Sequence, residues 1–201
     1  MDQRVEIKYN QSVESALWDR FRRGDAEAFS RLYDQYAFSL AAYGYRISRV
    51  EHLVKDAIQD LFIELWRSKE NLPPVKYVNA YLFKAIRYKL IKSGKQTILY
   101  CAEDTLSDLL SDDVSAETAI LRQEEETITI QKLSSAVKEL SLRQQEAVTL
   151  KFYHGFTNDQ IAEIMGVHYQ SATNILHRAL LTLRQHFNLS AILFLWFLQT
   201  A

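Results

Sequence analysis

Residues 140–184 read LSLRQQEAVTLKFYHGFTNDQIAEIMGVHYQSATNILHRALLTLR. Two capping boxes lie in this stretch, at residues 141–144 (SLRQ) and 157–160 (TNDQ), and each predicts the start of a helix. The second helix is short, and Gly166 then predicts a tight turn into a longer helix that ends near His186. A short helix, a glycine-containing turn and a longer helix form the helix-turn-helix pattern.

Apolar residues in this pattern recur at helical spacing and would lock the two helices together: Ile161, Ala162, Ile164, Val167, Ala172, Ile175, Leu176 and Leu183. The side chains left facing outward are Tyr169, Gln170, Thr173, Asn174, His177 and Arg178. Side chains of these kinds can bond base edges or phosphates, which favours DNA binding. The alternative is a helical hairpin that packs on another protein.

The N-terminal half predicts four more helices. One lies at residues 12–23, and Asp25 caps the next, whose apolar positions recur at three- and four-residue spacing. A capping box at residues 48–51 (SRVE) predicts the start of a third helix, which the proline pair at residues 73–74 would end. The fourth is expected from about Val78 to Ser93. The third helix has a broad apolar stripe, so we expect Phe62 and Trp66 in the core.

The composition favours an all-α fold with two helical domains. The chain has 201 residues with 48% hydrophobic content but 5 glycines and 2 prolines, too few for the many tight turns of a sandwich or barrel. Cys101 is the lone cysteine and the five histidines lie far apart, so we expect no disulfide, metal site or cofactor. The sequence contains no nucleophile motif or phosphate-binding loop, which predicts a non-enzyme without a small-molecule substrate.

The N-terminus lacks the apolar stretch of a signal peptide. The apolar run at residues 191–198 (AILFLWFL) is shorter than the roughly 18 residues that span a bilayer. Both observations predict a cytoplasmic protein. Because an exposed run of this kind promotes aggregation, we expect it to be buried against the second domain or in a partner.

Charge divides the chain into three segments. Residues 1–100 hold 17 Lys and Arg against 12 Asp and Glu, residues 101–128 hold 1 against 9, and residues 129–201 hold 6 against 4. Two basic segments joined by an acidic one suggest two nucleic-acid-facing domains and a spacer that repels the same ligand, although an ordinary solvated surface is the alternative. The predicted division is a first domain at 12–97, an acidic linker at 98–128, a second domain at 129–187 and a hydrophobic tail at 188–201. The TITI at residues 127–130 is interpreted as the start of a helix, because no other strand is predicted to pair with it.

The fourth helix and the segment before it combine basic and aromatic residues. No acidic residue occurs from Asn71 to Tyr100. Basic groups follow phosphates and aromatic rings stack on unpaired bases, so this segment suits single-stranded DNA. Some of the rings must belong to the core: Tyr81 lies on the inward stripe, and Phe83 is a second candidate.

Several of these stretches resemble one family. The stretch LSLRQQEAVTLKFYHGFTNDQIAEIMGV with ATNILHRALLTLR resembles domain four of the sigma-70 family. The stretch EHLVKDAIQDLFIELW with AYLFKAIRYKLIKSGKQ is similar to sigma domain two. Nothing substantial separates the two, which is typical of the extracytoplasmic-function (ECF) group, and the ending HRALLTLR most resembles factors of Bacteroidetes type. The resemblance covers about four fifths of the chain.

The resemblance implies a transcription initiation factor that binds RNA polymerase core and directs it to −10 and −35 promoter elements. Its partners would be the β′ clamp helices and β flap of the polymerase, promoter DNA and an anti-sigma factor. The residues at polymerase-binding positions are Asp56, Gln59, Asp60 and Glu64. The residues expected at the −10 element, where a non-template base is flipped and held, are Lys76, Tyr77, Lys84, Arg87, Tyr88, Lys92 and Lys95. Those expected at the −35 element are Thr157, Tyr169, Gln170, Ser171, Thr173, Asn174, His177 and Arg178.

Two other functions fit parts of the sequence. A conventional helix-turn-helix regulator would bind an operator without polymerase and use the N-terminal half for sensing or dimerisation. A helical adaptor would bind protein alone and would show no salt-sensitive affinity for DNA.

Overall fold

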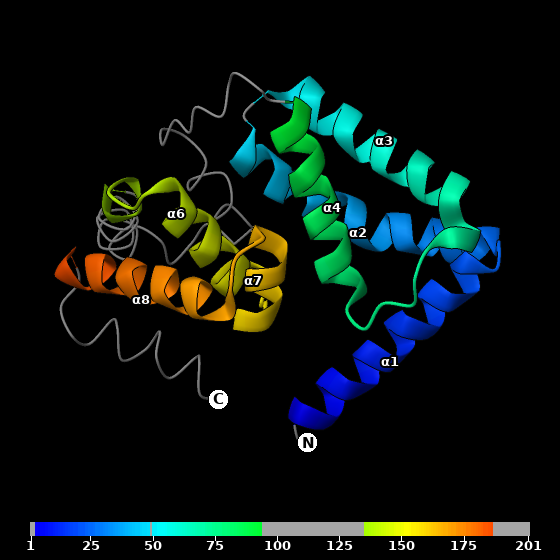
Figure 1. The fold of residues 1–201 in the computed structure, drawn as a ribbon, viewed down its shortest axis with the longest axis horizontal. Coiled ribbons are helices and arrows are strands. Elements are labelled where there is room, and N and C mark those ends of the chain that lie inside the picture. Colours follow the sequence, from blue (N-terminus) through cyan, green and yellow to red (C-terminus); the bar gives the residue numbers. More distant parts are fainter. Residues whose placement is uncertain (1–2, 49, 94–134, 187–201) are drawn as a thin grey trace, which may run out of the picture. The chain divides into compact units, whose positions relative to one another are not determined.

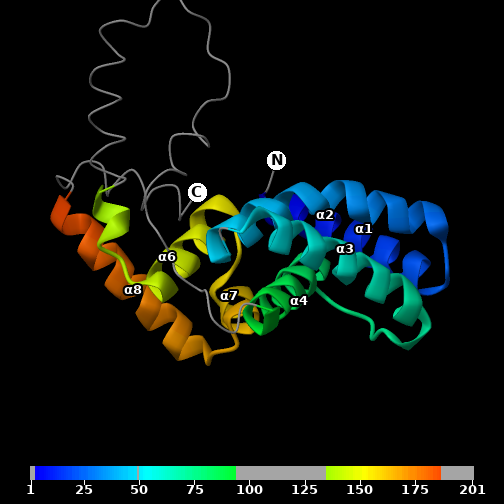
Figure 2. The same ribbon diagram turned by 90° about the horizontal axis from the view of Figure 1, so that it is seen from above.

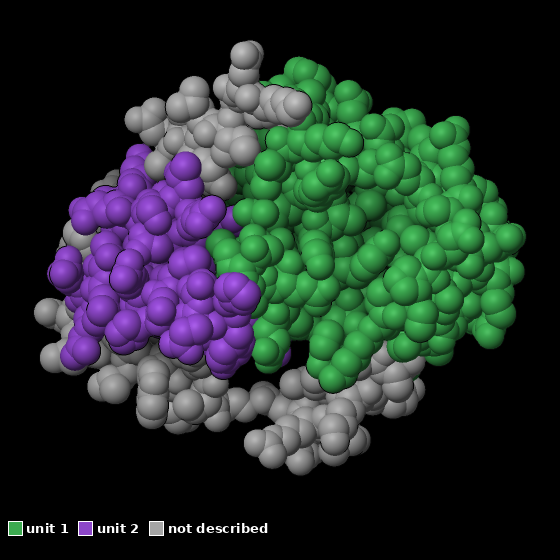
Figure 3. Space-filling model, viewed as in Figure 1, with its two compact units in different colours: residues 1–100, 159–167 green, residues 101–158, 168–201 purple. Residues whose placement is uncertain are grey.

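The computed structural model describes residues 3–48, 50–93 and 135–186, and of residues 3–12 and 186 it describes the backbone alone. The described residues form helices and no strand, which confirms the all-α prediction. By its contacts the chain divides into two units, residues 1–100 with 159–167 and residues 101–158 with 168–201 (Figure 3). The predicted domain limits stay a prediction, and the expected linker, the TITI segment and the tail lie outside the described residues.

Four long helices form the bundle of the first unit: α1 (Gln3–Arg22), α2 (Ala26–Ile47), α3 (Glu51–Ser68) and α4 (Val78–Ser93). The 3₁₀ turn η1 (Lys69–Asn71) follows α3. Helices α2, α3 and α4 each contact the other two, and α1 packs on α2 (Figure 1, Figure 2). The predicted range of α4 is confirmed at both ends, whereas α1 begins nine residues before the predicted start at residue 12.

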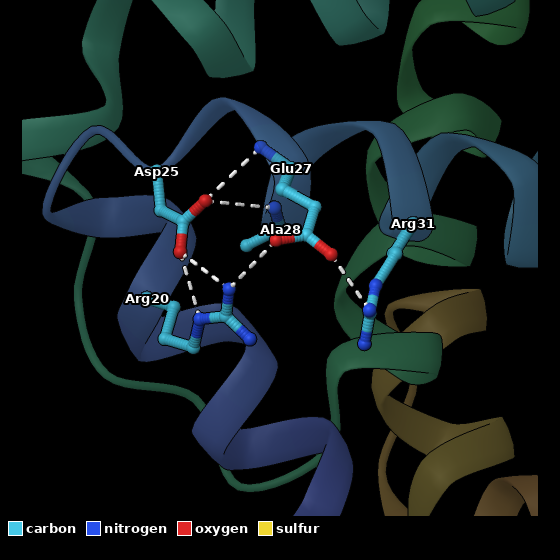
Figure 4. Close-up of polar contacts among 5 residues, drawn as sticks. All are labelled: Arg20, Asp25, Glu27, Ala28 and Arg31. Carbon is cyan, nitrogen blue, oxygen red and sulfur yellow. Dashed lines mark hydrogen bonds and ion pairs between the residues drawn. The ribbon is translucent and has the colours of Figure 1, made fainter.

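Hydrogen bonds to Asp25 form the corner between α1 and α2 (Figure 4). Gly24, with φ of 91°, ends α1, and the Asp25 N–H donates to the Arg20 carbonyl at 3.2 Å. The Asp25 carboxylate accepts from the backbone N–H groups of Glu27 and Ala28 at 3.0 and 3.1 Å, which confirms the predicted cap of α2. Arg20 lies 2.7 Å from the same carboxylate. The bond from the Ala28 N–H, followed by Arg20 and then by the Glu27 N–H, holds the pKa of Asp25 below its usual range.

The capping box predicted at residues 48–51 is wrong. Ser48 ends α2 instead, because its N–H donates to the Gly44 carbonyl at 2.8 Å and its side chain is buried. Val50 stands at the start of α3 and makes no side-chain cap. Because α3 begins only at Glu51, the N-cap position belongs to Val50 and not to Ser48, which stands directly after the last residue of α2.

Rings fill much of the bundle core. Trp18, Phe21, Tyr43, Phe62 and Phe83 are all buried. Phe62 meets the rings of Tyr33 and Phe29 edge-on at 4.9 and 6.0 Å, which confirms its predicted place in the core. Trp66 is buried only in part and carries the Lys69 ammonium over its ring at 4.5 Å, so its prediction is correct only in part. The prolines at residues 73–74 lie just after η1, in the connection to α4.

The C-terminal residues that the structure describes include two short helices, a π-helical segment and one long helix. They are α6 (Leu142–Val148), the π-helical segment η2 (Thr149–Tyr153), α7 (Asn158–Met165) and α8 (Tyr169–His186). The capping box at Ser141 is confirmed, with the Ser141 N–H donating to Gln144 Oε1 at 2.8 Å. Helices α6 and α8 pack together, and α8 contributes to a small core of Ala136, Leu140, Ala179 and Leu183.

A tight turn joins α7 to α8, as predicted. Gly166 has φ of 65°, a conformation that favours glycine, and a Cβ there would meet nothing within 4 Å. The Val167 N–H donates to the Ala162 carbonyl at 3.0 Å and the Gly166 N–H to the Glu163 carbonyl at 3.3 Å, which together make a Schellman motif. The glycine is therefore needed for the backbone path and not for space.

Candidate nucleic-acid interface

The solvent face of α4 carries basic and aromatic side chains together. Lys84, Tyr88 and Lys92 are exposed, Tyr88 by 66% of its surface. The Lys92 ammonium lies 5.9 Å from the centre of the Tyr88 ring. In the segment before α4, the exposed Lys76 places its ammonium 4.9 Å from the half-buried Tyr77 ring. The face offers cations for phosphates and rings for bases.

The other predicted −10 residues are placed differently. Arg87 is half-buried and engaged within the chain, and Lys95 lies outside the described residues. Phe83 belongs to the core, 5.0 Å from the Tyr43 ring. Tyr81 is half-buried with its ring edge-on to Trp18 at 5.3 Å, and burial raises the pKa of its phenol. The rings available to a ligand on α4 are therefore fewer than the sequence count suggests.

The polar stripe on α3 is exposed at all four predicted positions: Asp56, Gln59, Asp60 and Glu64. Glu64 is paired within the bundle, because Lys89 of α4 places its ammonium 2.6 Å from the carboxylate. The Lys89 side chain is only 19% exposed, so this cation is held beneath the stripe. The sequence did not predict this pair, since Glu64 and Lys89 lie on different helices. No described contact occupies the other acidic groups of the stripe, Asp56 and Asp60.

An apolar groove lies beside this stripe, between α2 and α3, with a volume of about 700 Å³. Its lining includes Phe29, Tyr33, Ile58, Phe62, Ile63 and Trp66. Gln59 belongs to both the stripe and the groove. The groove was not predicted from the sequence, although the small residues Ala37 and Ala41 on α2 are a signal for it, because they leave space between two helices whose other lining residues are larger.

The outward face of α8 carries the predicted −35 residues. Tyr169, Gln170, Ser171, Asn174, His177 and Arg178 are exposed, while Thr173 is half-buried and donates its hydroxyl to the Tyr169 carbonyl at 3.1 Å. Gln170 Nε2 donates to Asn174 Oδ1 at 3.4 Å, so these two side chains lie side by side. No acidic residue occurs in α8. Thr157 is exposed just before α7.

The described residues contain no group of three or more His, Cys, Asp or Glu side chains that could hold a metal ion. Among the same residues, no helix combines the length and apolar character that crossing a membrane requires.

Residues 130–183 match the family model described as sigma-70, region 4. The curated relatives include the ECF RNA polymerase sigma factor BldN of Streptomyces coelicolor, 28% identical over 83% of this chain and 63% of BldN. They also include the RNA polymerase sigma factor NccH of Alcaligenes xylosoxydans xylosoxydans, 24% identical over 84% of this chain and 91% of NccH. These similarities support the ECF sigma factor family. The chain thus spans less than two thirds of BldN and nearly all of NccH.

Solved structures agree in fold. The chain resembles CnrH in its complex with the cytosolic domain of CnrY, with a TM-score of 0.55 and 20% identity over 90% of this chain and 96% of CnrH. It also resembles the sigma factor RpoE of Bartonella quintana in complex with the anti-sigma factor NepR, with a TM-score of 0.51 and 21% identity over 79% of this chain and 95% of RpoE. Both curated relatives are named as RNA polymerase sigma factors.

Proposed function

We propose that this protein binds RNA polymerase core and directs it to promoters by contacting a −10 and a −35 element. The observation that carries the proposal is the pairing of two unlike surfaces on one bundle. The stripe on α3 is acidic and amide-bearing, whereas the face of α4 is basic and aromatic. A regulator that binds DNA alone has no need of the first surface.

The α3 stripe is the polymerase-docking surface in this proposal, through Asp56, Gln59, Asp60 and Glu64. Exposed carboxylates attract a basic partner and set its orientation, and the neighbouring apolar groove adds area that a partner helix can bury. The expected partner is the β′ clamp, with the β flap contacting the C-terminal domain.

The α4 face is the −10 surface. Lys76, Lys84 and Lys92 would follow phosphates of the melted strand, while Tyr77 and Tyr88 stack on unpaired bases. Arg87 and Lys95 complete the proposed set at its edges.

The outward face of α8 is the −35 surface. Gln170 and Asn174 can bond adenine and Arg178 can bond guanine in the major groove, with Tyr169, Ser171, Thr173, His177 and Thr157 around them. The absence of acidic residues from α8 suits approach to phosphates.

The same proposal includes an anti-sigma partner, a cytoplasmic location and the Bacteroidetes type of ECF factor. The resemblance to CnrH and RpoE, both solved with a protein partner, supports the first of these.

Transcription in vitro with purified core enzyme tests the function directly. A template pool randomised across the −35 and −10 windows is transcribed with core alone and with core plus this protein, and the transcripts are sequenced. We expect the protein to enrich a two-part sequence only when core is present. Selective binding of duplex DNA without core would instead identify a conventional regulator.

A further inference from the structure

Two side chains of α1 hold the segment that leads into α4. Trp18 Nε1 donates to the Pro73 carbonyl at 3.1 Å, and Arg22 Nε donates to the Leu72 carbonyl at 2.6 Å. The partners lie 55 and 50 residues apart in the sequence, so these are tertiary contacts and not local turns. Figure 1 shows the connection between α3 and α4 passing beside α1.

Both donors are themselves fixed. Trp18 is fully buried and packs its ring edge-on against Tyr81 of α4, with 5.3 Å between ring centres. The Arg22 guanidinium also bonds Asp19 one turn earlier at 3.1 Å, and its side chain is only 26% exposed. An indole and a guanidinium held in this way have few other orientations, so they define where the two carbonyls lie.

The anchored carbonyls immediately precede the exposed Pro74 and the Lys76–Tyr77 cation–π pair. This segment has no secondary structure from Leu72 to Lys76. Its backbone makes two further described hydrogen bonds: the Leu72 N–H donates to the Lys69 carbonyl, and the Tyr77 carbonyl accepts from the Tyr81 N–H. The path of residues 73–77 is therefore set in large part by α1.

We propose that Trp18 and Arg22 are positioning residues for promoter selection: they hold residues 72–77 in the conformation that presents Lys76 and Tyr77 to the −10 element. The inference rests on the proposed function, because it assumes that the α4 face and its preceding segment contact that element. Neither residue touches DNA in this scheme, and both act through the backbone that they hold.

Arg22→Gln and Arg23→Gln form a matched pair for the test. The two substitutions remove the same charge from adjacent positions, but Arg23 is exposed and has no described side-chain contact with the segment. Trp18→Phe is a second probe, since it keeps an aromatic ring in the core and removes the Nε1 donor. Arg22→Lys tests for rescue by a shorter cation.

The full-length variants are assayed with purified core on the randomised template pool, and the sequence preference in each window is compared with that of the wild type. We expect Arg22→Gln and Trp18→Phe to reduce the preference in the −10 window by about fivefold, the factor that corresponds to the contribution of one hydrogen bond to holding the segment in place. The preference in the −35 window and the affinity for core should stay at wild-type values, and Arg23→Gln should change neither window. Because a preference is a ratio within one sample, loss of folded protein does not alter it.

An unchanged −10 preference in both Arg22→Gln and Trp18→Phe would overturn the positioning role while the proposed function stands. An equal loss in both windows would also overturn it, since that result indicates general damage. A wild-type protein that enriches no sequence with core would contradict the proposed function itself.

Discussion

Helices α1 to α4 build one core, and α8 builds another with residues 135–140, and the two cores differ in their side chains. The first core contains six buried rings, among them Trp18, Phe21 and Phe62, and they meet neighbouring rings in tilted, edge-on and stacked geometries. The second contains Ala136 and Ala179 beside Leu140 and Leu183. Large rings keep helices apart and provide area to bury, whereas alanines let two helices approach closely. The first core should therefore be sensitive to deletion of atoms and the second to addition.

The largest effect is expected from Phe62→Ala. The change removes a ring that is 4% exposed and contacts Tyr33 and Phe29, so the free energy of unfolding should fall by about 3 to 5 kcal/mol. Trp66→Ala should cost less because that ring is partly solvated. Urea unfolding followed by circular dichroism measures both. Phe38, which is 76% exposed on α2, provides the control, and an equal cost for Phe38→Ala would contradict the core assignment.

The opposite change tests the alanine core. Ala179 has no exposed surface, so Ala179→Leu should lower the free energy of unfolding by about 1 to 3 kcal/mol through overpacking. Leu181 lies on the same helix and is 46% exposed, and Leu181→Ala should change stability by less than about 0.5 kcal/mol. A neutral Ala179→Leu would show that this core has room for a larger side chain.

A further prediction compares two outward residues of α8. Asn174→Ala should reduce discrimination at one −35 base pair by about tenfold, the order expected for one amide–adenine pair. If Arg178 contacts guanine, its removal has a similar effect at another base pair. If it contacts a phosphate, Arg178→Ala weakens all sequences alike and lowers the salt slope by about one. Binding of holoenzyme to matched and mutated sites separates the two, with Arg184→Ala as the control.

The exposed stripe of α3 should show a smaller effect on association. Asp60→Lys should weaken binding to core polymerase by about fivefold, since an exposed charge facing a basic partner contributes modestly. The thermal unfolding temperature should not change, because Asp60 is solvated. Asp34→Lys makes the same charge reversal on an exposed site of α2 and should leave the affinity unchanged. Equal affinity for all three proteins in a pull-down would contradict the docking surface.

Local signals in the sequence predicted most helix ends correctly. The Asp25 cap, the Ser141 box and the whole of α4 were found because each depends on residues a few positions apart. The Ser48 box was wrong because Ser48 is the C-cap of α2 and α3 begins three residues later, with Val50 at its N-cap position.

The outward face of α8 followed from helical periodicity, and its predicted residues are exposed except for the half-buried Thr173. Helical periodicity did not predict three other features: the Glu64–Lys89 pair, the groove between α2 and α3, and the two hydrogen bonds from α1 to residues 72–73. Each of these joins residues of different elements, and the relative rotation of those elements is decided by packing of the whole bundle.

The smallest effect concerns the polar corner before the ring-lined core, where Asp25 accepts from two backbone N–H groups and from Arg20. Asp25→Asn keeps an oxygen that can cap α2 but removes the charge that pairs with Arg20, so at neutral pH the variant should unfold at a slightly lower temperature. The pKa of Asp25 is lowered in the folded state from an ordinary value of 3.8. A carboxyl group whose pKa is lowered by folding stabilises the fold at pH values above its unfolded pKa, and it loses that contribution as the pH falls through its folded-state pKa.

The difference in unfolding temperature between wild type and Asp25→Asn should therefore be constant above about pH 5, shrink below pH 3.8 and vanish in stronger acid. Thermal scans from pH 7 to pH 2 measure it, with the exposed Asp34→Asn as the control that should show no such loss. A difference that persists unchanged in acid would mean that the variant disturbs the cap itself, and the ion pair with Arg20 would then contribute nothing to the corner.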